Sequence, residues 1–329
     1  MKDKKPKNRA RKFYPFKPVH VFKTSYDSGV IFYDTIDNLT MFTIICVNAA
    51  KFDVTVMGIS LMVTHAHELL KAETKQQISL FEDCCNCQYA KSKNMSVGKK
   101  GHVFKKRFGS APKWSDKKIR NAISYLYNNG YEKGLAADAM GYQWSFLPYA
   151  FSPHPFSKEM DGKNLSRRMS FAINTVRIMH KNNFPLKHTN LRRLFTGLEV
   201  EEQSQLVDFI ISTYSVIDFE STIRFYGSLE KMVAAIQSNT GEEYEIKEDY
   251  DGYPYHPFIA MSNYIGQAGL MNCVFSELPV QQLHDLICKL HMLDGVTHWH
   301  ISKFLHIPVP VVEDVIGPAL YCTGGKIAG

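Results

Sequence analysis

The sequence predicts an α+β protein whose first half alternates strands with helices and whose second half is mainly helical. Residues 54–64 form a short apolar run rich in β-branched side chains, which is typical of a buried strand. Helical spacing of apolar residues appears around this run, in the segments 37–50, 74–92 and 116–128. Beyond the Pro153–Pro155 segment, helical patterns dominate from about 165 to 238, and no internal repeat is visible.

The first half is predicted element by element. A basic tail covers 1–18, and we expect residues 1–12 to be disordered. Residues 20–32 alternate polar and apolar side chains around a turn at 26–29, which predicts a β-hairpin. The following elements are a helix at 37–50, a strand at 54–64, a helix from Thr74 to Ser92, a basic loop or short strand at 98–109, and a helix at 116–128. Ser115 should cap this last helix, which should end at Asn128-Asn129-Gly130.

The second half is divided into two predicted parts after a first domain at 19–155. Residues 156–270 form a helical region with an acidic loop at 240–257, and residues 271–329 form a C-terminal module. Three helices are predicted in this module, at 279–292, 298–305 and 308–316, with helix-turn-helix spacing. Because the last helix carries Glu313 and Asp314 but no lysine or arginine, dimerisation is as plausible for it as reading a DNA major groove.

Composition excludes several protein classes. The chain has 329 residues, 45% of them hydrophobic, which suits a globular protein with two or three domains. No run of about 18 apolar residues predicts a membrane span, and no apolar signal segment is visible at the start. The seven cysteines lack zinc-site spacing, so we expect reduced thiols and a cytoplasmic, nucleoid-associated protein.

Charge is distributed unevenly along the chain. Residues 91–120 contain eleven lysines and arginines and one acidic residue, whereas 196–260 contain thirteen acidic residues and three basic ones. A basic block of this density predicts a polyanionic partner, although a solvated basic surface is the alternative. The acidic region could cover the basic block in the absence of DNA.

The motif His65-Ala66-His67 is the first candidate site. Side chains alternate along a strand, so the two histidines should project from one face while Ala66 points into the core. Two imidazoles in this arrangement can bind one divalent metal. The pair His298 and His300 lies in a helical pattern, where residues i and i+2 diverge, and it should not chelate a metal.

The predicted helix 116–128 supplies the partners. Tyr125 and Asn129 are four residues apart and share a helix face, whereas Tyr127 should point away and pack in the core. We expect His65, His67 and Asn129 to hold Mg²⁺ or Mn²⁺ and Tyr125 to attack a phosphate, forming a phosphotyrosine as a 3′-hydroxyl leaves. Structural tyrosines are common in helices, so packing remains the alternative for Tyr125.

Four ordered motifs resemble those of a known family. They are His65-Ala66-His67, the segment from Gly101 to Ser110 (Gly-His-Val-Phe-Lys-Lys-Arg-Phe-Gly-Ser), Tyr125-Leu126-Tyr127-Asn128-Asn129, and Tyr142-Gln143-Trp144-Ser145. Over residues 19–155 the chain resembles the single-tyrosine transposases of the HUH endonuclease superfamily, in particular their REP-associated relatives. It differs from the family pattern at Val63-Thr64, before the first histidine, and at Gly130, where the family has proline.

The resemblance implies a ferredoxin-like (RRM-like) domain, a sheet with helices on one face, and a transposase that cleaves and rejoins single-stranded DNA beside a hairpin through a 5′-phosphotyrosine. It implies Tyr125 as the nucleophile and Asn129 as the third metal ligand. The predicted DNA-binding residues are Lys99, Lys100, His102, Phe104, Lys105, Lys106, Arg107, Lys117, Lys118 and Arg120. Lysines would follow phosphates and aromatic rings would stack on bases, although core packing is favoured for Phe104 and Phe108.

Other functions remain open at this point. A non-catalytic DNA-binding regulator could keep the fold and lose the chemistry, and a metal-dependent hydrolase could use water in place of Tyr125. An RRM-like RNA-binding module would show aromatic residues on adjacent central strands, and the sequence has no such pattern. A homodimer is also possible.

Overall fold

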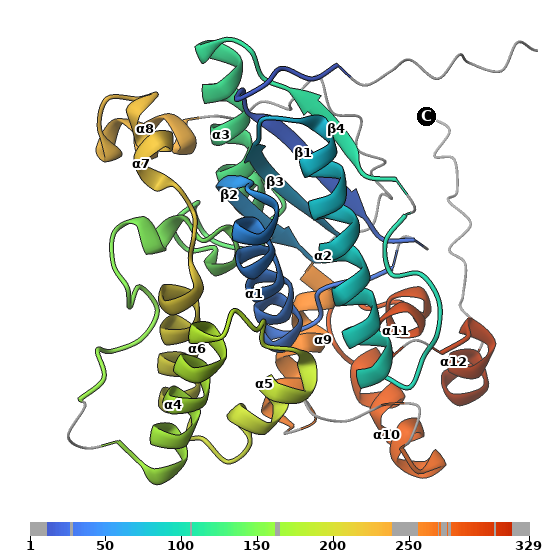
Figure 1. Ribbon diagram of the computed structural model, residues 1–329. Helices are drawn as coiled ribbons and strands as arrows, with labels where there is room; N and C mark the ends of the chain where they lie inside the picture. Colours follow the sequence, from blue (N-terminus) through green and yellow to red (C-terminus); the bar gives the residue numbers. More distant parts are fainter. Residues whose placement is uncertain are drawn as a thin grey trace, which may run out of the picture.

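The computed structural model describes residues 12–26, 29–105, 107–161, 165–238, 256–268, 270, 275, 278–305 and 307–317. It is an α+β structure with a four-stranded antiparallel sheet and many helices, as predicted (Figure 1). Most of the predicted disordered tail and nearly all of the predicted acidic loop lie outside the described residues. Within the described part of the chain, no helix is both long enough and apolar enough to cross a membrane.

The sheet is built from strands β1 (Val19–Thr24), β2 (Thr55–Met62), β3 (His65–Lys71) and β4 (Gly109–Pro112). Their spatial order is β2-β3-β1-β4, and each neighbouring pair is antiparallel. Helix α1 (Thr35–Phe52) connects β1 to β2, and α2 (Lys75–Ser96) connects β3 to β4. The two connections therefore carry the chain between strands that are not adjacent in the sheet.

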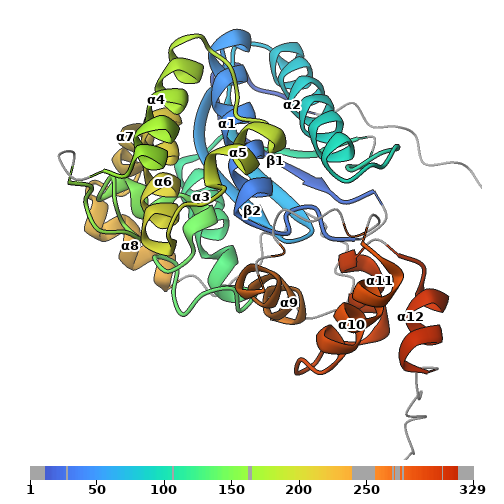
Figure 2. The same ribbon diagram turned by 90° about the horizontal axis from the view of Figure 1, so that it is seen from below.

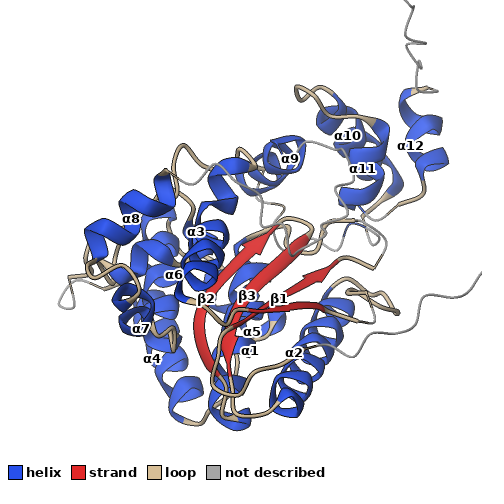
Figure 3. Ribbon diagram, turned by 90° about the horizontal axis from the view of Figure 1, so that it is seen from above, coloured by secondary structure: helices blue, strands red, loops and turns tan. Residues whose placement is uncertain are grey.

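Helices cover both faces of this sheet. Helices α1 and α2 pack on one face, where Val21, Ile59, Ala66 and Leu70 join the largest hydrophobic core. Helix α3 (Asp116–Glu132) packs on the other face against Met57 and Leu69 (Figure 3). The expectation of helices on one face alone was wrong, because the amphipathic helix α3 folds back over the second face.

The predicted hairpin at 20–32 does not form. Strand β1 is an interior strand, and both of its edges are already occupied by β3 and β4. After β1, the backbone N–H groups of Ile31 and Phe32 instead donate to the carbonyl of Val63, in the turn between β2 and β3. The alternating pattern identified β1 correctly, but it could not show which strands would pair with it.

Strand β3 was missed, and the prediction of one strand ending near His65 was wrong. Strand β2 ends at Met62, the chain turns at Val63-Thr64, and His65 begins a new strand. The strand reads His-Ala-His-Glu-Leu-Leu-Lys, whose alanine, glutamate and leucines favour helix. Pairing with β1 and β2 on both edges overrides this local preference.

Helix α3 starts after the predicted Ser115 cap but runs four residues further than predicted, to Glu132. Gly130 lies inside the helix, and the ring of Tyr142 packs directly against it. A Cβ at position 130 would lie 2.4 Å from two ring atoms of Tyr142. The Tyr142 hydroxyl donates to the carbonyl of Leu61 over 2.5 Å, which ties this end of α3 to the end of β2.

The remaining helices follow the predicted helical character of the second half. They are α4 (Arg167–Lys181), α5 (His188–Phe195), α6 (Val200–Tyr214), α7 (Phe219–Arg224), α8 (Leu229–Gln237), α9 (His256–Gln267), α10 (Val280–His291), α11 (His298–Leu305) and α12 (Val309–Ile316). The last three match the predicted C-terminal helices within two residues. Figure 2 shows α9–α12 gathered beside the sheet, and their core includes Val30 from the loop after β1.

A buried ion cluster lies between the sheet and α2. The ammonium group of Lys23 lies 2.6 Å from a carboxylate oxygen of Glu68 and 2.9 Å from one of Glu82, and all three side chains are buried. Burial alone lowers the pKa of Lys23, but the two carboxylates outweigh it and raise the pKa above its ordinary value. Burial and the charge of Glu68 raise the pKa of Glu82, which favours its protonated form.

A second buried cluster joins α1, α2 and α5. Asp37 accepts hydrogen bonds of 2.7 Å from the Lys93 ammonium group and shares one of 2.8 Å with His188. Burial alone raises the pKa of Asp37, but Lys93 and His188 together hold it below its ordinary value. Burial and the Asp37 carboxylate raise the pKa of the neighbouring Asp34 to about 7. This cluster fixes the start of α1.

Candidate active site

His65 and His67 begin β3 and face α3. Because strand side chains alternate, Ala66 points to the opposite face, where it joins the core under α1 and α2, as expected. The two imidazole rings have centroids 4.9 Å apart. They are 7% and 0% exposed, so these histidines are part of a buried site and not of an exposed strand end.

Each imidazole is held through its Nδ1 atom. Thr64 Oγ1 lies 3.1 Å from Nδ1 of His65, and His20 Nε2 lies 3.1 Å from Nδ1 of His67. Metal-binding histidines usually make such a second hydrogen bond, which fixes the ring and its tautomer. The geometry therefore assigns Nε2 of each ring as the nitrogen suited to a metal.

Two residues of this arrangement were not singled out in the sequence. Thr64 belongs to the Val63-Thr64 pair that departs from the family pattern, and its hydroxyl now has a role beside His65. His20 lies on β1, diagonal to His67 across the strand pair, and is fully buried. A histidine inside a predicted strand was the available signal for His20, but the pairing of β1 with β3 was needed to interpret it.

Tyr125 on α3 lies against the same histidines. Its ring centroid is 5.5 Å from that of His67 and 5.8 Å from that of His20, and the side chain is 6% exposed. Tyr127, by contrast, is fully buried and its hydroxyl donates to the carbonyl of Met57. Burial raises the pKa of Tyr127, as suits the packing role expected for it. The structure thus brings Tyr125, and not Tyr127, to the histidine pair.

Asn129 lies one helical turn beyond Tyr125 and is fully buried. Neither its amide oxygen nor its amide nitrogen has a hydrogen-bond partner among the described residues. Buried polar groups nearly always have such a partner, so this amide is suited to a ligand. Its neighbour Gly130 packs on Tyr142, whose hydroxyl donates to the carbonyl of Leu61 at the end of β2. The next residue of β2, Met62, pairs with His65 in the sheet.

These donors form a mixed nitrogen and oxygen set. The amide oxygen suits Mg²⁺ or Mn²⁺, whereas imidazole nitrogens suit first-row transition metals, so Mn²⁺ fits the set better than Mg²⁺. In the described part of the chain, the candidate site included, no group of three or more His, Cys, Asp or Glu side chains is arranged to share a metal ion; the set at this site has two histidines and takes its third donor from the amide of Asn129. The other His-x-His pair lies on helix α11, as expected, where His300 Nδ1 bonds to Thr297 and His298 lies against His291.

The basic block lies mainly in the loop between α2 and β4 and at the start of α3. Lys100, His102, Lys105, Arg107 and Lys117 are exposed, Lys99, Lys118 and Arg120 are partly exposed, and Lys106 lies outside the described residues. Phe104 is only 6% exposed and packs on Tyr89, with ring centroids 5.6 Å apart. Core packing, the role favoured for Phe104, is therefore confirmed, and its place among the predicted DNA-binding residues is corrected because its ring faces the core.

An exposed aromatic residue of this block was not singled out. Trp114, just before the cap of α3, is 48% exposed, and the Lys118 ammonium group lies 3.6 Å from its ring centroid. Tyr14 packs beside it at 6.0 Å. A tryptophan among lysines was the available signal. His102 likewise packs against Tyr26, at 5.3 Å.

Comparisons with known proteins add one similarity. No family model matches the chain, and no curated protein matches it. A solved structure of a REP-associated tyrosine transposase bound to a REP hairpin is similar, with 15% sequence identity and a TM-score of 0.37. The similarity covers 48% of this chain and 93% of that one. We therefore base the proposed function on the geometry of the site.

Proposed function

We propose that this protein is a metal-dependent transposase or nickase that cleaves and rejoins single-stranded DNA through a covalent 5′-phosphotyrosine on Tyr125. The observation that carries the proposal is the placement of Tyr125 against His67, one helical turn from the buried, unbonded amide of Asn129. A phenol beside a set of metal-ligating groups is the arrangement needed for nucleophilic attack on a phosphate.

Each residue has a defined task in this proposal. His65, His67 and Asn129 would hold Mg²⁺ or Mn²⁺, which would supply charge neutralisation at the phosphate. Tyr125 Oη forms a bond to phosphorus and gives up its proton, while the bond from phosphorus to O3′ breaks and the 3′ oxygen takes up a proton. Attack by a later 3′-hydroxyl reverses these steps and rejoins the strand. Thr64 and His20 keep the two imidazoles in the required orientation.

The remaining architecture supports this assignment. The element order β1-α1-β2-β3-α2-β4 and the strand order β2-β3-β1-β4 suit a ferredoxin-like nuclease domain at residues 19–155. The exposed lysines and arginine of the 99–120 block suit phosphates of a strand beside a hairpin. We assign 156–270 as a helical region and 271–329 as a helix-turn-helix-like module for DNA binding or homodimerisation, in a cytoplasmic, nucleoid-associated protein.

A covalent-adduct assay tests the proposal. The protein is incubated with labelled single-stranded DNA and Mn²⁺, and adducts that survive SDS are resolved on a gel. Tyr125→Phe and His65→Ala should each abolish the adduct. Tyr127→Phe is the matched control, since it removes a hydroxyl two residues away that only bonds to Met57. If Tyr127→Phe loses the adduct and Tyr125→Phe keeps it, the assignment of Tyr125 as the nucleophile is wrong.

The alternative is a regulator of the same fold that binds DNA without cutting it. The exposed basic residues around Trp114 would serve binding equally well. The same assay separates the two functions: a regulator binds the labelled strand in a mobility-shift gel and gives no adduct with either metal.

A further inference from the structure

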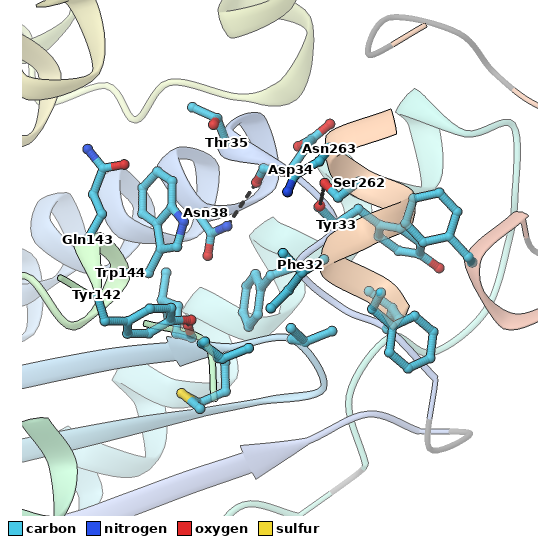
Figure 4. A pocket seen from close by; sticks show the side chains of 18 of the residues that line it. Phe32, Tyr33, Asp34, Thr35, Asn38, Tyr142, Gln143, Trp144, Ser262 and Asn263 are labelled. Carbon is cyan, nitrogen blue, oxygen red and sulfur yellow. Dashed lines mark hydrogen bonds between the residues drawn. The ribbon is translucent and has the colours of Figure 1, made fainter. Parts of the chain in front are cut away.

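A cavity lies at the junction of the sheet and the C-terminal helices, near the candidate active site. It has a volume of about 280 Å³ and lies between the start of α1, the end of β2, the Tyr142-Gln143-Trp144 segment and α9 (Figure 4). Leu61, Met62 and Val63 form part of its wall, and Met62 is the sheet partner of His65. The cavity and the histidine pair thus share the turn between β2 and β3.

The walls of this cavity are aromatic. Phe32, Tyr142 and Trp144 line it from the sheet side, and Phe258 and Phe304 line it from the C-terminal helices. Flat apolar walls of this kind accept planar rings by stacking. The lining includes no lysine or arginine, and its acidic residue is Asp34, whose pKa burial and Asp37 raise to about 7. The cavity offers no cation to pair with a phosphate, so we expect an occupant that is neutral where it enters the cavity.

Asn38 gives the cavity a specific polar contact. Its side chain is 5% exposed and lines the cavity, and its amide nitrogen donates to the carbonyl of Asp34 over 2.9 Å. Its amide oxygen has no hydrogen-bond partner among the described residues (Figure 4). Asn48, in the same helix, makes the same bond to the carbonyl four residues earlier, but its oxygen accepts from Cys84 and Gln88. The Asn38 oxygen is therefore an unused buried acceptor.

We propose that this cavity binds a single unpaired nucleobase that carries an exocyclic amino group, between aromatic walls and with that amino group donating to Asn38 Oδ1. Adenine, cytosine and guanine offer such a donor, whereas thymine presents oxygens and one ring N–H. Bases of unpaired strands are commonly recognised by stacking on aromatic residues together with hydrogen bonds to their edges. The sugar and phosphate would remain outside.

The base comes either from single-stranded DNA or from a free nucleotide, and the site chemistry is the same for both. The assignment to DNA rests on the proposed function, in which a base held beside the β2–β3 turn would position the strand at His65. Base binding itself requires neither Tyr125 nor a metal. It can therefore be measured in the Tyr125→Phe protein without metal, where the proposed cleavage cannot occur.

Binding of the four deoxynucleosides is the first measurement, by chemical-shift titration of ¹⁵N-labelled Tyr125→Phe protein. Deoxyadenosine, deoxycytidine or deoxyguanosine should bind at least fivefold more tightly than thymidine. Adding Asn38→Ala should weaken the best binder by about fivefold to tenfold, which is the usual net effect of one hydrogen bond. Trp144→Leu, which removes a stacking wall, should weaken it by at least about fivefold.

Asn182→Ala is the matched control, because it removes an asparagine with the same backbone bond on the surface of α4, far in sequence from the cavity. It should leave nucleoside binding unchanged. Absence of saturable binding, equal binding of thymidine, or unchanged binding in both Asn38→Ala and Trp144→Leu would overturn the proposal. Asn38→Ala removes a buried acceptor that lacks a partner, so the variant should fold.

Oligonucleotides identify the source of the base. A thymidine homopolymer with one internal copy of the best-binding base is compared with the plain homopolymer. Tighter binding of the substituted strand, lost in Asn38→Ala, assigns the cavity to single-stranded DNA. Equal binding of the two strands, with nucleoside binding intact, assigns it to a free nucleotide. A failed adduct assay with intact nucleoside binding would reject the proposed cleavage and keep this site.

Discussion

Replacing Gly130 with alanine should destabilise the protein, although the position is helical. In an open helix this substitution gains about 1 kcal/mol, because alanine has the higher helix propensity. Here the new methyl group would lie 2.4 Å from the Tyr142 ring, which is buried and tied to Leu61 by its hydroxyl. Overpacking of this kind costs about 1–3 kcal/mol. Because the tied ring cannot move aside easily, we expect the upper end of that range and a net loss of about 1–2 kcal/mol.

The measurement is the free energy of unfolding in urea, in two backgrounds. In the Tyr142→Ala background the ring is absent, so Gly130→Ala should instead stabilise the protein by about 1 kcal/mol. Tyr142→Phe keeps the ring but removes its bond to Leu61, and should give an intermediate cost. The sign change between backgrounds is the decisive result. If Gly130→Ala stabilises the protein that retains Tyr142, the packing argument is refuted.

Three further predictions follow from the buried polar groups. Lys23→Met should lower the free energy of unfolding by about 3–5 kcal/mol, because it leaves its carboxylate partners buried without a cation. Lys17→Met, at an exposed lysine, is the control. If Lys23→Met loses no more stability than Lys17→Met, the prediction is contradicted. The pKa of Asp37 is lowered in the folded state, so ionised Asp37 stabilises the folded protein above about pH 4. This stabilisation is lost as the pH falls further. Because the pKa of Asp34 is raised, the stabilisation from Asp34 is lost as the pH rises from about 4 to 7. The urea midpoints of wild type and Asp37→Asn should therefore be compared below about pH 4. If the two midpoints fall in parallel there as the pH is lowered, the predicted contribution of Asp37 is refuted. Thr64→Val should weaken Mn²⁺ binding, measured by calorimetry, by about tenfold, and unchanged affinity would remove Thr64 from the site.

The sequence predicted local elements better than it predicted their pairing. The start of α2 near Thr74, the cap at Ser115 and the helical periodicity of α3 were identified because capping and periodicity are properties of adjacent residues. The hairpin after β1 and the missed strand β3 failed for one reason. In both cases, the outcome depends on which distant strands occupy the edges of β1 and β3, and no short window contains that information.

Some residues of the candidate site could likewise be predicted from local spacing, whereas others depend on how distant strands pair. Tyr125 and Asn129 could be paired from their spacing in one helix, and His65 and His67 from their alternation in one strand. His20 could not be added, because its contact with His67 spans 47 residues and two strands. Phe104 was placed among the DNA-binding residues because it lies among lysines, although core packing was favoured for it. A neighbouring charge says nothing about the direction in which a ring points, and this ring packs on Tyr89.

The ion cluster on one face of the sheet and the histidine pair on the other depend on the same register. Glu68 follows His67 directly in β3, so a slip of one residue would turn Glu68 toward Tyr125 and His67 toward α2. Lys23 binds Glu68 across the β1–β3 pair, and such a slip would leave Lys23 and Glu82 buried without it. Buried charges are poor sources of net stability but can select one register over another. The cluster therefore contributes to the site by fixing which side of β3 faces α3.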